Sequence, residues 1–204
     1  MTLADVPGVI ALQRRAFPKM PTWHPSHLEA HLKRFPEGQV VALDGAGRVV
    51  GSASSLIVRW ADFSDTASWE TITADGTFRT HDLNGDTLYG AEIMVDPEAR
   101  GMGVGSKLYE ARKAIARRFN VKSMIAGGRI PGYSAVAHLM GPEAYVAEVV
   151  AGRRKDMVLS FQLSNGFRVR GVIPSYLADD QASCGFATLI EWVNDAYHEA
   201  MPAA

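Results

Sequence analysis

Arg100 is followed by three glycines at alternating positions, Gly101, Gly103 and Gly105, and then by apolar residues at helical spacing. Glycine lets the backbone approach a ligand closely and adopt conformations that other residues rarely adopt. The free N–H groups of such a loop and of the first helical turn point together, at the positive end of the helix dipole. With the Arg100 guanidinium beside them, these donors would suit a phosphate or pyrophosphate group.

Two familiar nucleotide-binding patterns do not fit this loop. A dinucleotide fold needs G-x-G-x-x-G and a later acidic residue, and the glycines at 101, 103 and 105 have a different spacing. A P-loop needs Gly-Lys-Ser/Thr, whereas the order here is Gly105-Ser106-Lys107. An isolated glycine-rich turn is usually only a tight connection between a strand and a helix. The loop alone therefore leaves two hypotheses open, a phosphate site and a plain turn.

The segments around this loop alternate between strand and helix patterns. The spacing of apolar residues and the Pro and Gly breaks predict helices over 2–17, from 25 to 35, over 103–119, within 141–154 and after Asp156. Strands are predicted at 39–43, 49–58, 87–95, 122–126, 167–173 and 186–192. This order predicts a mixed α/β domain with one central sheet flanked by helices.

We expect a single domain over 1–204, because no internal repeat or low-complexity tract divides the chain. Residues 59–86 show no helical period and are rich in Thr, Asp, Gly and Trp, so a long loop or an inserted hairpin is expected there. Residues 195–204 are expected to form a frayed tail.

Composition restricts the partners and the location. The chain has 204 residues, 47% of them hydrophobic, and a net charge of -1, which favours neither nucleic acid nor an anionic membrane as a partner. No apolar run is long enough to span a bilayer and the N-terminus lacks signal-peptide features, so a cytoplasmic location is the default expectation. The single cysteine, Cys184, is expected to be a buried thiol.

The stretch from 89 to 105, YGAEIMVDPEARGMGVG, resembles the coenzyme A signature of the GNAT superfamily of N-acyltransferases, Gln/Arg-x-x-Gly-x-Gly/Ala. Arg100, Gly103 and Gly105 occupy its three fixed positions. Residues 161–167, FQLSNGF, resemble the helix end and Gly-Phe that lead into the sixth strand of the family. The stretches GGRIPGY (127–133) and LSFQLSNGF (159–167) resemble a branch often fused ahead of a carbon–nitrogen hydrolase domain.

This resemblance covers about residues 2–192 and implies a GNAT-like mixed sheet with acetyl-CoA as the cofactor and no metal. Most GNAT domains open with a strand, whereas this chain begins with a helical pattern, so the first strand is expected to be missing or replaced. The backbone near Met94 and Val95 would bind pantetheine. The cofactor loop itself would consist of Arg100, Gly101, Met102, Gly103, Val104, Gly105 and Ser106.

The implied reaction is the direct attack of an amine on a thioester held between two parallel strands. Glu92 is the candidate base, with a surface or ion-paired carboxylate as the alternative. Many members carry a tyrosine five residues before the Phe of Gly-Phe that reprotonates the thiolate, but this chain has Gln162 there. Tyr133 is the candidate acid, with a structural role as the alternative and Tyr89 in reserve.

The acceptor would be a small-molecule amine or a peptide amine, covered by residues 20–31 and by the 59–86 insertion. His24, His27 and His31 are expected to form a solvated or acceptor-binding face rather than a metal site. The polar face of helix 103–119 is expected to be solvated and consists of Arg112, Lys113, Arg117 and Arg118. A non-catalytic coenzyme A-binding sensor is the alternative function, and a homodimer is compatible with either.

Overall fold

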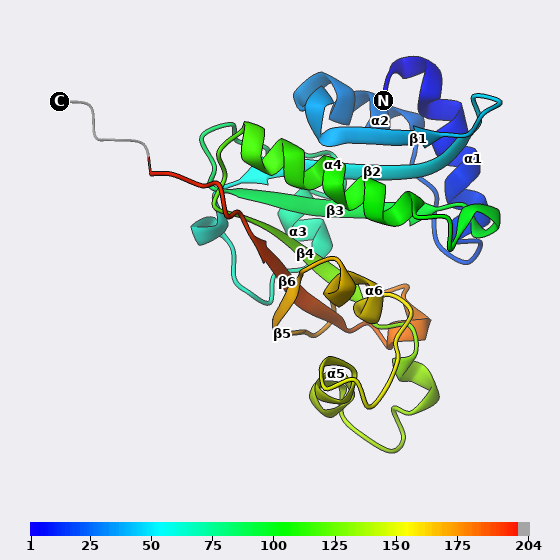
Figure 1. Cartoon of the computed structure of the whole chain (residues 1–204), viewed down its shortest axis with the longest axis vertical. Helices are drawn as coiled ribbons and strands as arrows, with labels where there is room; N and C mark the ends of the chain where they lie inside the picture. The colour runs from blue at the N-terminus through cyan, green and yellow to red at the C-terminus, as the bar shows by residue number, and fades with distance from the viewer. Residues whose placement is uncertain (200–204) are drawn as a thin grey trace.

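The computed structural model describes residues 1–199 and has one six-stranded sheet at its centre (Figure 1). The spatial order of the strands is β1-β2-β3-β4-β6-β5, with every neighbouring pair antiparallel except β3 and β4. The strands are β1 (Gln39–Leu43), β2 (Val49–Val58), β3 (Thr87–Val95), β4 (Ser123–Arg129), β5 (Arg168–Ile173) and β6 (Ala187–Val193). The predicted mixed α/β fold is confirmed.

Helices cover both faces of this sheet. They are α1 (Val6–Ala16), α2 (Pro25–Arg34), α3 (Trp69–Thr73), α4 (Val104–Arg118), α5 (Pro142–Val150) and α6 (Leu159–Ser164). Helix α4 lies across β1–β3 on one face, and α1 and α2 lie on the opposite face (Figure 1). Within residues 1–199 no strand lies before β1, so the two N-terminal helices lead directly into the sheet.

Amphipathic patterns explain where these helices pack. Helix α4 buries Tyr109 and Ala116 in the largest apolar cluster, whereas α1 buries Val9 and Leu12 in the cluster on the other face. Each fully buried large side chain of this kind contributes roughly 1.5–3 kcal/mol. Near α6 the Asp156 carboxylate accepts hydrogen bonds from two backbone N–H groups that the short helix leaves free.

The parallel strands β3 and β4 pair over only three residues each, 87–89 with 123–125. Beyond that point they diverge, and Figure 1 shows β4, β5 and β6 turning away from β1–β3. Opposite Ser54 and Ser55 the register of β3 shifts, since Ser54 faces Glu92 and Ser55 faces Gly90, which leaves Ala91 as a bulge. The split and the bulge lie together, and the candidate site is built around them.

The 59–86 insertion contains no strand, so the hairpin alternative was wrong. It contains a 3-10 turn, Trp60–Asp62, and helix α3, whose first turn is capped by the Ser68 hydroxyl. Five helical residues are too few to show a periodic pattern, which explains why the sequence indicated only a loop. Strand β4 also extends three residues beyond its predicted end at 126.

Several predictions about exposure were wrong. Arg112 is fully buried beneath β2 and β3 instead of solvated, because Gly90 and the small Ser54 and Ser55 leave room for its guanidinium. Lys113, expected on the same solvated face, is also buried, because its side chain lies over the Trp192 ring. Cys184 is exposed instead of buried, since it ends a short turn in the connector between β5 and β6 with a left-handed φ of 51°.

Candidate active site

A cavity of about 390 Å³ lies where β3 and β4 diverge. Its lining includes side chains from both faces of the sheet. On the α4 face these are Tyr109, Arg112, Val158 and Gln162. On the opposite face they include Phe17, Met20, Trp23, His27, Trp69, Glu70, Asp75, Tyr176 and Asp179. The cavity therefore joins the two faces through the split, so that two molecules could meet inside it from opposite sides.

Glu92, the predicted base, lines this cavity directly after the bulge of β3. Both of its carboxylate oxygens are buried, and neither has a hydrogen-bond partner of normal geometry among residues 1–199. Burial raises the pKa of Glu92 from 4.5 to about 7, against the opposing attraction of the Arg112 guanidinium and the Trp23 indole N–H. A carboxyl that titrates near neutral pH in a cavity is suited to general base chemistry.

The backbone on either side of the bulge is held from both faces of the sheet. Trp69 Nε1 donates to the carbonyl oxygen of Ala91 at 2.9 Å from the face that carries α3. From the α4 face, Arg112 Nη2 donates to the carbonyl oxygens of Glu92 and Ser54. Arg112 is 1% exposed, and its Nε also donates to the Ser55 hydroxyl at 3.0 Å. These bonds satisfy buried carbonyls and fix the backbone that carries Glu92.

Two consecutive glycines of β4 make room for cavity-lining side chains. A Cβ atom on Gly127 would lie 2.0 Å from Cζ of Tyr176, and one on Gly128 would lie 2.3 Å from Oε1 of Gln162. The Tyr176 hydroxyl also lies 2.6 Å from that of Tyr89. Tyr176 was not predicted from the sequence, although the Gly-Gly pair was a usable signal of close approach to a strand.

Gln162 and Tyr109 lie on the α4 face of the cavity. Gln162 is buried, and its Oε1 has no hydrogen-bond partner among the described residues. Tyr109 is also buried, and burial raises the pKa of its phenol against the opposing effects of the Arg112 charge and the Gln162 side chain. A tyrosine hydroxyl is therefore present beside the position where the family pattern has its tyrosine.

The glycine loop lies at the start of α4 and is open to solvent. Gly101 and Gly103 have φ angles of 77° and 78°, and a Cβ atom at either would have no neighbour within 4 Å. Gly105 has another role, since a Cβ there would lie 2.7 Å from Phe161 of α6. The first helical turn leaves the N–H groups of Val104, Gly105 and Ser106 without intrahelical acceptors. An exposed cradle with free donors fits a phosphate group, and Arg100 and Met102 are exposed beside it.

The other predicted site residues lie away from the cavity lining. Met94 is buried in the cluster under α1, and Val95 pairs with Gly51 at the end of β3. Tyr133 is buried in the cluster around α5, and its hydroxyl donates to the carbonyl oxygen of Met140 at 3.2 Å. The structure thus brings Glu92 together with Tyr109, Gln162 and Tyr176, but not with Tyr133.

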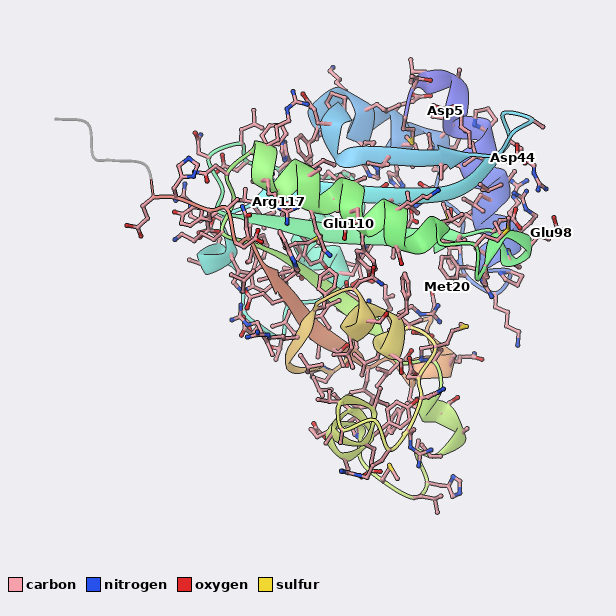
Figure 2. All side chains as sticks on the ribbon, in the orientation of Figure 1. Asp5, Met20, Asp44, Glu98, Glu110 and Arg117 are labelled. Atoms are coloured by element: carbon pink, nitrogen blue, oxygen red, sulfur yellow. The ribbon has the colours of Figure 1, made fainter. Side chains whose placement is uncertain are left out.

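Both segments expected near the acceptor reach the face of the cavity opposite α4. The 20–31 segment contributes Met20, labelled in Figure 2, together with Trp23 and His27, and the insertion contributes Trp69 and Glu70.

The prediction of a solvated or acceptor-binding histidine face was wrong for His31, which is fully buried. Its ring stacks on Phe78 with centroids 3.5 Å apart, and its Nε2 lies 2.7 Å from the carbonyl oxygen of Gly76. Burial lowers the pKa of His31 to about 4, so this side chain anchors the insertion as a neutral ring.

Within residues 1–199 no group of three or more His, Cys, Asp or Glu side chains could hold a metal ion. No helix in the same range is long and apolar enough to cross a membrane.

Comparison with known proteins gives matches over most of the chain. The family model described as "Acetyltransferase (GNAT) family" matches residues 6–137. YkwB of Bacillus subtilis, described as an uncharacterized N-acetyltransferase, is 35% identical over 203 residues, which is 98% of this chain and 89% of that protein. YhcX of Bacillus subtilis, described as a probable hydrolase, is 46% identical over 193 residues. This match covers 95% of the chain but spans only 37% of the length of YhcX.

Solved structures share the fold. The GphF GNAT-like decarboxylase in complex with isobutyryl-CoA has a TM-score of 0.80 at 25% identity, over 95% of this chain and 97% of that one. Naa20 of Chaetomium thermophilum in complex with a bisubstrate analogue has a TM-score of 0.63 at 18% identity, over 96% and 85% of the two chains. The second likeness is one of fold alone.

Proposed function

The chain belongs to the GNAT acetyltransferase family, and from this membership we propose that it transfers an acetyl group from acetyl-CoA to a primary amine. The observation that carries the proposal is Glu92, a buried carboxyl with a pKa of about 7 in the cavity between two diverging parallel strands. Because side chains from both faces of the sheet line this cavity, the thioester and the amine could approach from opposite sides.

The cofactor would be bound by backbone groups and by Arg100. Free N–H groups at the start of α4 and the exposed Gly101 and Gly103 would hold the pyrophosphate. Beyond Tyr89 the edge of β3 that faces β4 has no paired strand among the described residues, so its backbone is available to pantetheine around Met94 and Val95. A backbone N–H on this edge would polarise the thioester carbonyl.

Glu92 would act as the base. An alkylamine is protonated at neutral pH, and the ionised Glu92 carboxylate would take one proton from it, directly or through a water molecule. The neutral nitrogen then bonds to the thioester carbon and loses its second proton to water, the carbon–sulfur bond breaks, and coenzyme A leaves as a thiolate. Arg112 and Trp69 would keep Glu92 in place through the carbonyls of the bulge.

The thiolate needs a proton, and we assign the acid role to Tyr109. Tyr133, the candidate from the sequence, donates its hydroxyl to Met140 and does not line the cavity. Tyr109 lines the cavity beside Gln162, and although burial raises the pKa of its phenol, the Arg112 guanidinium opposes part of that rise. A cationic neighbour would also stabilise the phenolate that remains after the proton has been given up.

A second candidate is the decarboxylation of an acyl-CoA that carries a carboxylate, since the structurally similar GphF protein is described as a GNAT-like decarboxylase. The buried Arg112, which lines the cavity on the α4 face, is the observation that favours it. Nη1 of Arg112, which the hydrogen bonds to Ser54, Ser55 and Glu92 do not use, could orient a substrate carboxylate. The carbon–carbon bond would then break, carbon dioxide would leave, and the remaining enolate would take a proton from solvent.

The test is an assay of coenzyme A thiol release from acetyl-CoA across a panel of primary amines. Amine-dependent release that is lost in Glu92→Gln and kept in Glu143→Gln, an exposed glutamate outside the cavity, is the expected result. Coenzyme A binding without release from any amine would instead favour a non-catalytic sensor. Carbon dioxide release from a carboxylated acyl-CoA without an amine would favour the decarboxylase.

A further inference from the structure

We propose that the acceptor carries a second positive charge besides the reacting amine, and that Glu70, Asp75 and Asp179 bind it on the face of the cavity opposite α4. The position of the reacting amine at Glu92 rests on the proposed function. The binding of an organic dication does not rest on the proposed function, because Glu70, Asp75 and Asp179 have no role in acyl transfer.

The three carboxylates come from separate segments and line the same cavity. Glu70 lies in α3, Asp75 follows α3, and Asp179 lies in the connector between β5 and β6. Within residues 1–199 none of the three has an ion-pair partner or a side-chain hydrogen bond. Glu70 is half-buried and Asp75 and Asp179 are exposed, so a cation that enters the cavity would be attracted to all three carboxylates.

The positive groups of this face do not supply that cation. Arg129 lines the cavity, but its guanidinium is bound at both Nε and Nη2 by the Asp180 carboxylate, at 2.6 and 2.5 Å. Arg112 lies on the α4 face, where two backbone carbonyls accept from its Nη2 and the Ser55 hydroxyl accepts from its Nε. His27 is the other basic side chain of the lining. The charge left for a ligand on this face is therefore negative.

Two tryptophans provide an independent indication of a cationic ligand. Trp23 and Trp69 line the cavity with ring centroids 5.5 Å apart and planes tilted by 47°. Gly76 fixes the pair, because a Cβ there would lie 2.8 Å from Trp23 and 3.0 Å from Trp69. Trp23 is 9% exposed and its Nε1 has no normal hydrogen-bond partner among the described residues. Aromatic faces attract organic cations, most strongly where water is excluded.

Glu92 lines the same cavity, and neither of its buried oxygens has a hydrogen-bond partner of normal geometry among the described residues. One ammonium group would meet Glu92, and a second would meet the three carboxylates. A molecule with cationic groups at both ends, such as an alkyl diamine or a lysine-like chain, matches this distribution better than a monoamine or an amino acid does. The carboxylate of a free amino acid would be repelled.

The inference can be tested by titration calorimetry with 1,5-diaminopentane and 1-aminopentane, which have equal chain lengths, in the presence and absence of coenzyme A. We expect the diamine to bind at least about tenfold tighter at low salt, with a preference that shrinks as ionic strength rises. The triple variant Glu70→Gln, Asp75→Asn, Asp179→Asn should lose this preference. The control Glu29→Gln, Asp62→Asn, Glu143→Gln changes the net charge equally at exposed sites outside the cavity and should keep it.

Equal binding of the two amines, or an unchanged preference in the cavity variant, would overturn the inference. Thermal melting of both triple variants checks that they are folded. Thiol release from acetyl-CoA is measured separately, so the two proposals can fail independently. Diamine binding without thiol release would keep the dication site and remove acyl transfer.

Discussion

The hydroxyl oxygens of Tyr89 and Tyr176 lie 2.6 Å apart, and the two side chains are only 0% and 3% exposed. Two phenols carry two protons, but one hydrogen bond between them uses only one. Tyr89 has no other side-chain hydrogen bond among the described residues, whereas Tyr176 also lines the cavity. The arrangement that buries no unpaired donor has Tyr89 donating to Tyr176, whose own proton is then directed toward the cavity.

This pair predicts a non-additive effect on stability. Tyr176→Phe should lower the free energy of unfolding by about 1–3 kcal/mol, because it leaves the fully buried Tyr89 hydroxyl without a partner. Tyr89→Phe should cost less, since Tyr176 keeps access to the cavity. The double variant should be more stable than the sum of the single changes implies. Urea unfolding of all four proteins measures the coupling, and strictly additive losses would show that the hydroxyls do not interact.

A second prediction concerns the pH dependence of turnover. The base must be ionised, so the rate should rise as the pH increases through about 7, the pKa of Glu92. Glu92→Gln should remove this rise and lower turnover by roughly 10²–10⁴-fold. Coenzyme A affinity should stay unchanged, because Glu92 lies away from the glycine loop. Initial rates across the pH range test this, and a mutant profile equal to that of the wild type would eliminate Glu92 as the base.

The same pKa predicts that Glu92 destabilises the fold at neutral pH. Its folded-state pKa of about 7 is above the ordinary value of 4.5, so the folded state holds a proton that the unfolded chain has already lost between these values. Stability therefore falls as the pH rises from 4.5 to 7, and the full penalty remains above 7. Glu92→Gln should be more stable than the wild type by about 1–3 kcal/mol at pH 8 and by much less at pH 4.5. Denaturant unfolding at both pH values measures the difference, and an equal effect at both would contradict the linkage.

A further prediction is that Arg112 affects catalysis by holding the backbone that carries Glu92. Lysine cannot match the planar guanidinium that bonds to two carbonyls and the Ser55 hydroxyl. Arg112→Lys should therefore lower stability by about 1–3 kcal/mol through unpaired carbonyls. It should also lower kcat more than it raises the KM for acetyl-CoA, because the bulge that carries Glu92 would relax. Arg118→Lys on the exposed side of the same helix is the control. Full activity in Arg112→Lys would exclude this positioning role.

Most of the fold was predictable because its strands are separated by clear breaks. The bounds of β1, β2 and β3 agree with the prediction, since each strand is an apolar run that ends at a turn or at Asp96-Pro97. Helix α3 was not predictable, because five residues carry too little periodicity. The burial of Arg112 was hidden for another reason. Its position on the helix predicts a solvent-exposed side chain. The space for its guanidinium exists only in the folded chain, where Gly90 has no side chain to fill it.

The candidate site was predictable where one chain segment determines it. Glu92 lies on the strand that leads into the cofactor loop, so its place beside the split could be inferred from local order. Tyr176 and Tyr109 reach the cavity from segments distant in sequence, and no local pattern marks a tyrosine as cavity-lining. Tyr133 was chosen for its position after a predicted strand, but its hydroxyl is used in the α5 cluster instead.

The cofactor loop allows a prediction in which charge is separated from backbone strain. Gly103 has a φ of 78° with open space around it, a conformation that Asn and Asp tolerate better than most residues. Gly103→Asn and Gly103→Asp therefore carry similar strain and bulk, and they differ mainly in charge. The aspartate would place a negative charge where the pyrophosphate is expected, so coenzyme A should bind at least about tenfold more weakly to Gly103→Asp than to Gly103→Asn.

Gly47→Asp, at a hairpin turn with the same φ and open space, is the control for strain alone. Calorimetric titration with coenzyme A on folded variants measures the difference. Wild-type affinity in Gly103→Asp would remove this loop from the cofactor site, and the acyl-CoA assignment would then lose its main support in the sequence.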